Sequence, residues 1–153
     1  MKKTILFSLI LFLLLNGCTT EENNEKTYQT QQAAIHNIFN QYQISGFIVL
    51  IHTTDDQQLF FAENNETFFA GDIKEQEEGF VPRKLTANIA LNNTTGATFE
   101  IPIEEQDYLL IITSDTKKGS FSVPNSDYYF DLVTEENHHS VVDDFSVIYK
   151  DSL

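Results

Sequence analysis

The segment of residues 135–144, EENHHSVVDD, places two histidines and four carboxylates within ten positions. Imidazole nitrogens and carboxylate oxygens bind zinc and similar divalent cations. The candidate metal ligands are Glu136, His138, His139 and Asp143. Successive residues of a strand point to opposite faces, so only a loop could turn both histidines toward one ion. The alternative is a solvated acidic loop between two strands, which we favour, and we expect no metal or other cofactor.

A Ser-x-x-Lys spacing occurs once, from Ser114 to Lys117. In serine acyl-transfer enzymes this spacing works because a helix brings the lysine beside the serine. Here the intervening Asp115 and Thr116, with Gly119 close behind, are ordinary turn residues. We therefore expect a hairpin tip without a nucleophile, and no catalytic residues.

The only cysteine, Cys18, ends the most apolar stretch of the chain. Lys2 and Lys3 precede a run from Ile5 to Leu15 that is almost entirely aliphatic or Phe. The run is shorter than the roughly 20 apolar residues that span a bilayer as a helix. A positive start followed by a short apolar segment is typical of a secretory signal.

The end of that segment, Leu15-Asn16-Gly17-Cys18, resembles the lipobox of bacterial lipoproteins. The resemblance covers only the targeting segment, and we recognise no family for the rest. It implies that residues 1–17 are a signal peptide, cleaved before Cys18. It also implies that Cys18 carries lipid, with acyl chains such as palmitate. The expected location is the bacterial cell envelope, as a membrane-anchored lipoprotein facing the periplasm or the outside.

The chain is strongly acidic, with a formal charge of −14. Loss of residues 1–17 would remove two lysines and no acids, which changes −14 to −16. A surface of this sign repels the phosphate backbone, so nucleic acid is excluded as a partner. With a single cysteine there is no internal disulfide, and packing must stabilise the domain.

The chain divides into a tether and one domain. Residues 18–27 are polar and acidic and predict a flexible tether for the lipidated cysteine. Residues 28–153 predict a single β-rich domain that opens with a helix. Its apolar stripe is formed by Ile35, Ile38, Phe39 and Tyr42. Either of two threonines, Thr27 or Thr30, could cap the helix, and Gly46 is a plausible stop.

From Gly46 onward the apolar period changes to two, which indicates strands. A hairpin is predicted at Asp55-Asp56, and residues 72–79 are predicted to be a charged loop. The predicted strands are 46–53, 57–63, 66–71, 86–92, 98–105, 108–114, 120–123, 128–133 and 145–150.

Two of these strands differ in expected position. Pro102 removes a ladder donor and favours an edge strand for residues 98–105. Residues 108–114 are apolar on both faces, which favours a central strand. We therefore expect truncation of Ile111 to cost more stability than truncation of Ile101.

Short strands joined by turn residues predict a mainly β fold. We expect an antiparallel β-sandwich or barrel with one N-terminal helix. The alternative is an α+β fold with a helix packed on an antiparallel sheet.

Neighbouring aromatic residues are candidates for binding. Residues of a strand cannot share one buried face with their neighbours, so the pairs Phe68-Phe69 and Tyr128-Tyr129 each direct one ring to solvent or to a second layer. An exposed ring could stack on sugar or anchor a partner, although packing is the commoner role.

Two functions fit these patterns. The first is a lipid-anchored envelope protein whose domain binds a protein or glycan without catalysis. The alternative is an enzyme or enzyme accessory that acts on an envelope polymer through carboxylates that the sequence does not pair. A deep pocket with two carboxylates would favour the enzyme, and exposed aromatic rings would favour the binding protein.

Overall fold

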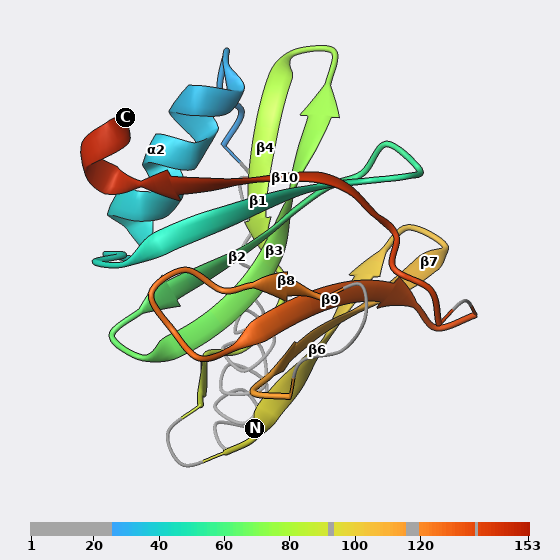
Figure 1. The fold of residues 1–153 in the computed structure, drawn as a ribbon. Helices are drawn as coiled ribbons and strands as arrows, with labels where there is room; N and C mark the ends of the chain where they lie inside the picture. The colour runs from blue at the N-terminus through green and yellow to red at the C-terminus, as the bar shows by residue number, and fades with distance from the viewer. Residues whose placement is uncertain (1–25, 92–93, 116–119, 137) are drawn as a thin grey trace, which may run out of the picture.

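The computed structural model describes residues 26–91, 94–115, 120–136 and 138–153. They form three layers: a helix, a first antiparallel sheet and a second antiparallel sheet (Figure 1). The predicted β-sandwich with one helix is thereby confirmed, and that helix packs on the outer face of one sheet. Cys18 and the lipobox lie outside the described residues.

The helix, α2, spans Gln31–Gln41. Thr30 is its N-cap, since the Thr30 hydroxyl accepts a hydrogen bond from the Ala33 N–H at 3.1 Å. The predicted stop at Gly46 is wrong, because the helix ends at Gln41 with Tyr42 as its C-cap, and the next residue, Gln43, takes a left-handed φ of 51°. Of the predicted apolar stripe, Ile35, Ile38 and Phe39 are buried and Tyr42 is partly buried against the same cluster.

The first sheet has the strand order β10-β1-β2-β3-β4, with β5 also paired to β3. All pairings are antiparallel. Its strands are β1 (Phe47–Thr53), β2 (Gln58–Asn64), β3 (Thr67–Gln76), β4 (Gly79–Lys84), β5 (Ile89–Ala90) and β10 (Val142–Tyr149). The last strand therefore returns to lie beside the first (Figure 1).

The predicted charged loop at residues 72–79 is wrong. Asp72–Gln76 continue β3, and Gly79 begins β4. Asp72 is 3% exposed and lies directly opposite Arg83, whose Nε donates to Asp72 Oδ1 at 2.9 Å. A buried carboxylate is tolerated when it is paired and hydrogen-bonded, and this pair allows a charged residue inside the sheet.

The second sheet has the order β6-β7-β9-β8. Its strands are β6 (Gly96–Ile103), β7 (Gln106–Thr113), β8 (Phe121–Ser122) and β9 (Tyr129–Thr134). The edge position of the Pro102 strand and the central position of β7 are confirmed. However, Ile111 is only half-buried, on the outer face of this sheet, whereas Ile101 is 1% exposed in the core between the sheets.

The first sheet is covered on both faces. Its residues facing α2 are Ile48, Leu50, Phe60, Ala62, Phe69 and Ile73. The alternate residues face the second sheet, and include Phe47, Val49, Ile51, Leu59, Phe61 and Phe68. In each of the pairs Phe60-Phe61 and Phe68-Phe69, one ring is therefore buried on the α2 side of the sheet and the other on the side of the second sheet.

The segment before α2 is attached to the first sheet at Tyr28, which forms an isolated antiparallel bridge with Phe80 of β4. The Tyr28 N–H donates to the Phe80 carbonyl at 2.9 Å, and the Phe80 N–H donates back at 2.8 Å. At the other end, β10 leads into a 3₁₀ turn at Lys150–Ser152. Among the described residues, we find no helix with the length and apolar character needed to cross a membrane.

Candidate functional site

The four candidate metal ligands are spread over a loop and a strand. Glu136, His138 and His139 lie in the connection between β9 and β10, and Asp143 lies within β10. All four side chains are exposed. In the described part of the chain, no group of three His, Cys, Asp or Glu residues is placed to hold a metal ion.

The predicted hairpin between residues 108–114 and 120–123 is wrong, because β7 pairs with β6 and β9, while β8 pairs with β9. Ser114 lies directly after β7. Its N–H and its hydroxyl both donate to the Thr95 carbonyl, at 2.8 and 3.3 Å. The hydroxyl therefore serves to close the end of the β6–β7 pair. The partner positions of the motif, Thr116 and Lys117, lie outside the described residues.

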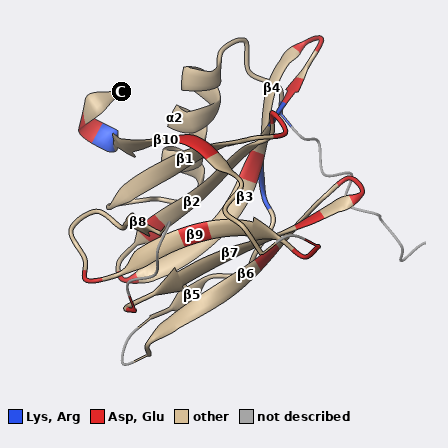
Figure 2. Ribbon diagram, turned by 45° about the vertical axis from the view of Figure 1, so that its right-hand side comes forward, with Lys and Arg blue, Asp and Glu red and all other residues tan. Residues whose placement is uncertain are grey.

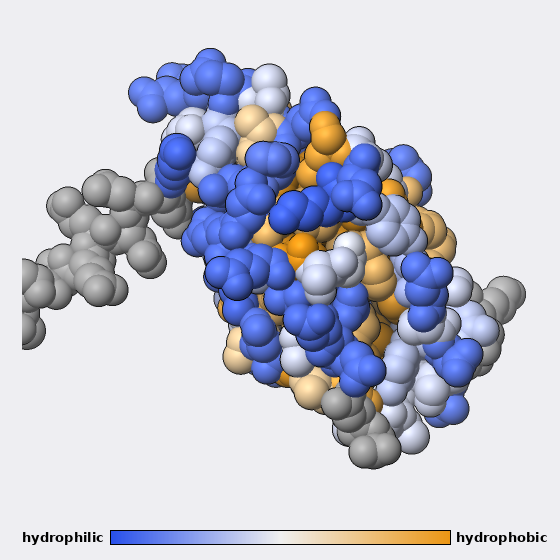
Figure 3. Space-filling view, turned by 90° about the vertical axis from the view of Figure 1, so that its left-hand side faces the viewer, coloured by the Kyte–Doolittle hydropathy of each residue, from blue (hydrophilic) through white to orange (hydrophobic). Residues whose placement is uncertain are grey.

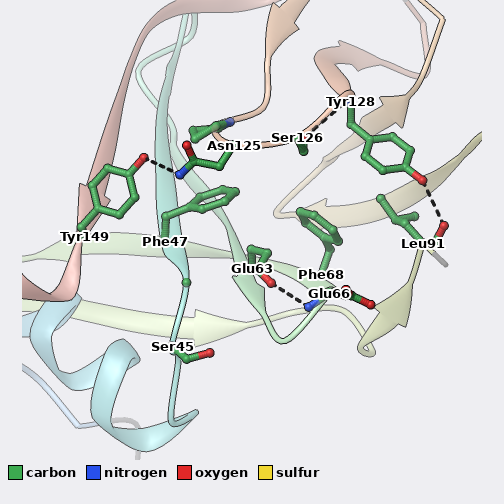
Figure 4. A pocket seen from close by; sticks show the side chains of 12 residues that line it. Ser45, Phe47, Glu63, Glu66, Phe68, Leu91, Asn125, Ser126, Tyr128 and Tyr149 are labelled. Atoms are coloured by element: carbon green, nitrogen blue, oxygen red, sulfur yellow. Dashed lines mark hydrogen bonds between the residues drawn. The ribbon is translucent and has the colours of Figure 1, made fainter.

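A pocket of about 590 Å³ opens at one end of the sandwich, between the two sheets. It is bordered by the start of β1, the β2–β3 turn, the segment between β8 and β9, and the end of β10 (Figure 4). Its lining residues are Ser45, Gly46, Phe47, Glu63, Glu66, Phe68, Leu91, Pro124, Asn125, Ser126, Tyr128 and Tyr149. Figure 3 shows this end of the molecule, with apolar side chains at the middle of the face and hydrophilic ones around them.

Aromatic rings form the walls of the pocket. Phe47 and Tyr149 are register partners in the β1–β10 pair, and their ring centroids are 6.3 Å apart at an interplanar angle of 66°. Phe68 stands on β3, which β2 separates from β1. On the opposite wall, Tyr128 donates its hydroxyl to the Leu91 carbonyl at 3.0 Å, which fixes the ring (Figure 4).

The β2–β3 turn supplies two carboxylates. Both residues of this two-residue turn, Asn65 and Glu66, have positive φ, at 52° and 64°. The Glu66 N–H donates to Glu63 Oε1 at 2.7 Å, so Glu63 holds the turn closed. Gly46 leaves the space that the Glu63 carboxylate occupies, since a Cβ at that position would overlap it. Glu66 itself is exposed at the rim.

The charged residues that line the pocket, Glu63 and Glu66, are both acidic. None of its lining residues, all within the described ranges, is Lys, Arg or His. Figure 2 shows the same bias over the described part of the ribbon, where acidic positions are spread over turns and strands and basic ones are few. The lining therefore combines apolar ring faces with hydrogen-bond acceptors and negative charge.

Sequence reasoning found part of this site. Phe68 and Tyr128, two of the four aromatic candidates, line the pocket. Phe69 packs beneath α2, and Tyr129 lies in β9 outside the pocket. Phe47, Tyr149 and the two glutamates were missed. Phe47 and Tyr149 meet through the β1–β10 pairing, which joins distant parts of the chain and has no local sequence signal.

A second polar cluster lies at the opposite end of β1. The buried Tyr108 hydroxyl and the Thr53 hydroxyl both donate to the Asp55 carboxylate. Burial, with the hydrogen bond to Asp55, raises the pKa of Tyr108 well above its usual range. Burial alone would raise the pKa of Asp55, but the bonds from Thr53 and Tyr108 outweigh it and lower that pKa.

Tyr108→Phe is expected to change how the free energy of unfolding depends on pH under alkaline conditions. Because the folded pKa of Tyr108 is raised, its contribution is fully present below pH 10 and is lost as pH rises from there toward the folded value. Above pH 10, the free energy of unfolding of the wild type should fall by up to about 1.4 kcal/mol per pH unit because of Tyr108. The variant lacks this group and should not show that fall. Urea midpoints at pH 7, 9 and 11 measure this, with the exposed Tyr149→Phe as control. Parallel curves for the wild type and Tyr108→Phe would contradict it.

The chemistry of the pocket suits reversible binding. Its hydroxyls, on Ser45, Ser126 and the tyrosines, have no His or Lys among the described lining residues to act as a base. Aromatic faces with a polar rim are the usual composition of a ligand site. No protein-family model, no curated protein and no solved structure matches this chain.

Proposed function

We propose that this chain is a lipid-anchored protein of the bacterial cell envelope whose β-sandwich binds a protein or glycan without chemical change. The observation that carries the binding role is the aromatic pocket at the end of the sandwich. The anchoring role is carried by the lipobox-like residues 15–18.

The form of the pocket supports binding. Phe47 and Phe68 are each 5% exposed and form the apolar interior of the pocket, while Tyr149, at 42%, is the exposed aromatic residue. Tyrosine supplies contact area at low entropic cost and is enriched among residues that dominate binding energy. The pocket stands on strand ends and tight turns, which hold such rings in position.

Catalysis by the two pocket glutamates is the second candidate. Glu63 and Glu66 lie at the same turn, as a carboxylate mechanism would require. However, Glu63 already accepts the Glu66 N–H, which gives it a structural task. Binding therefore accounts for the arrangement with fewer requirements.

A pull-down with a matched variant tests the binding role. The bait is the full chain with a C-terminal tag, solubilised in detergent and exposed to envelope extract and to envelope glycans. Tyr149→Ala should reduce the captured partner roughly tenfold, the effect of about 1.4 kcal/mol. Tyr129→Ala, an aromatic truncation outside the pocket, is the control and should leave capture unchanged.

Equal capture by the wild type and Tyr149→Ala would show that the partner binds elsewhere, and would overturn the pocket as the binding site. If the wild type turns over a glycan and Glu66→Gln does not, that result would instead favour the enzyme.

A further inference from the structure

The side chain of Lys84 makes cation–π contacts with two aromatic rings of the same chain. On the helix side of the first sheet, the Lys84 Nζ lies 4.6 Å from the Phe69 ring centroid and 5.4 Å from that of Tyr42. The two rings form a corner, with centroids 5.2 Å apart and planes at 62°. An ammonium group over ring faces is stabilised by the ring quadrupole, more so where water is excluded.

The pocket contains a corner of the same kind. The Phe47 and Tyr149 rings meet at 66° with centroids 6.3 Å apart. No described lysine or arginine lines this corner of the pocket, and Asn125 lies beside it, with its Nδ2 donating to the Tyr149 hydroxyl at 3.5 Å (Figure 4). The accessible ring of this corner is Tyr149, at 42% exposure, and Glu63 and Glu66 line the same pocket.

The turn beside this corner carries a residue that the backbone does not favour. A two-residue hairpin turn with positive φ at both positions prefers Asn followed by Gly. This chain has Asn65 followed by Glu66, and Glu66 has a φ of 64°. A bulky residue in the left-handed region costs stability, and such strain concentrates at functional sites. Glu66 is also exposed at the pocket rim, where its carboxylate can meet a ligand.

We infer that the pocket receives the side chain of a lysine or arginine from a partner protein. The apolar stem packs on Phe47, Phe68 and Tyr149, and the charged end lies against the carboxylates of the β2–β3 turn. Charge complementarity supports this occupant, since the chain carries −14 overall and the described lining carries no positive group. The inference rests on the proposed function and specifies its ligand.

The test uses two peptides that differ in one charge. A short neutral peptide with a single lysine is titrated into the full chain in detergent micelles and followed by NMR shift changes. The matched peptide has norleucine in place of lysine, which keeps the stem and removes the ammonium. We expect the lysine peptide to bind at least fivefold more tightly, and the difference to shrink at high salt.

Glu66→Gly separates the binding role from a structural one. It should raise the melting midpoint, by about 3 °C, because glycine suits the positive φ of the turn. At the same time it should reduce the affinity for the lysine peptide several-fold. Tyr149→Ala should weaken it as well. Glu100→Gln, an exposed acid on β6 outside the pocket, is the charge-matched control and should have no effect.

Equal affinity for the two peptides would overturn the inference. So would a loss of lysine binding in Glu100→Gln as large as in Glu66→Gly, because that pattern marks general surface charge. A neutral oligosaccharide that binds in the pocket while the lysine peptide does not would overturn the cationic ligand and leave the proposed binding function standing. The proposed function itself fails on the separate result that Tyr149→Ala leaves partner capture unchanged.

Discussion

Ile101→Ala is expected to destabilise the protein by about 2–5 kcal/mol, which is the range for truncating a buried isoleucine. The Ile101 side chain is 1% exposed and packs in the core between the two sheets. Its removal loses the transfer energy of three carbon atoms and leaves a cavity among close-packed neighbours. Since the total stability of a domain is about 5–15 kcal/mol, and this one has no disulfide, the variant should be poorly folded or rapidly degraded.

Ile111→Ala is the matched comparison and should cost less, roughly 1 kcal/mol, because its side chain is already partly in water. Denaturant melts of the two variants measure the difference directly, with unchanged m-values as the sign that the folded state is retained. A larger loss in Ile111→Ala would mean that the outer face of the second sheet is covered in solution, and would contradict the burial described above.

This order reverses the expectation from sequence, and the reason is physical. The sequence placed both strands correctly, with β6 at the edge and β7 in the centre. Burial of a side chain, however, depends on the face it occupies as well as on the strand. Residues 108–114 are apolar on both faces, yet the residues of β7 on the outer face, Leu109 and Ile111, are only half-buried.

The strands that are apolar on both faces because they are buried on both faces are β1, β2 and β3. They lie between α2 and the second sheet, and a local pattern does not reveal how many layers a chain will build. The helix and its threonine cap were predictable because the stripe and the cap are local. The extension of β3 through Asp72 was not, because its paired charge, Arg83, arrives from the next strand.

The pocket was the least predictable feature. Its walls come from five separate segments, and the return of β10 to pair with β1 brings Tyr149 beside Phe47. Antiparallel order among many short strands has too many solutions for a single sequence to choose between them. The aromatic pairs did mark Phe68 and Tyr128, because alternation along a strand restricts where two neighbouring rings can go.

Cys18→Ala should abolish lipid attachment completely and remove the protein's hold on the membrane. By the lipobox resemblance, the Cys18 thiol is the acceptor of the diacylglyceryl group, and alanine has no nucleophile to replace it. Each acyl chain buries on the order of ten or more methylenes at about 0.8 kcal/mol each, and two chains are needed for stable anchoring. The acidic domain supplies no substitute, because a charge of −14 or below is repelled by anionic headgroups.

Metabolic labelling with a fatty acid measures this effect, together with the size of the product. The wild type should carry label, whereas Cys18→Ala should carry none and should remain unprocessed or be released, since the lipobox resemblance implies that a dedicated signal peptidase cuts before this cysteine. Thr19→Ala, a change at the adjacent position, is the control and should be labelled as the wild type is. Label retained in Cys18→Ala would place the lipid on another residue, and the assignment of residues 15–18 as a lipobox would then be wrong.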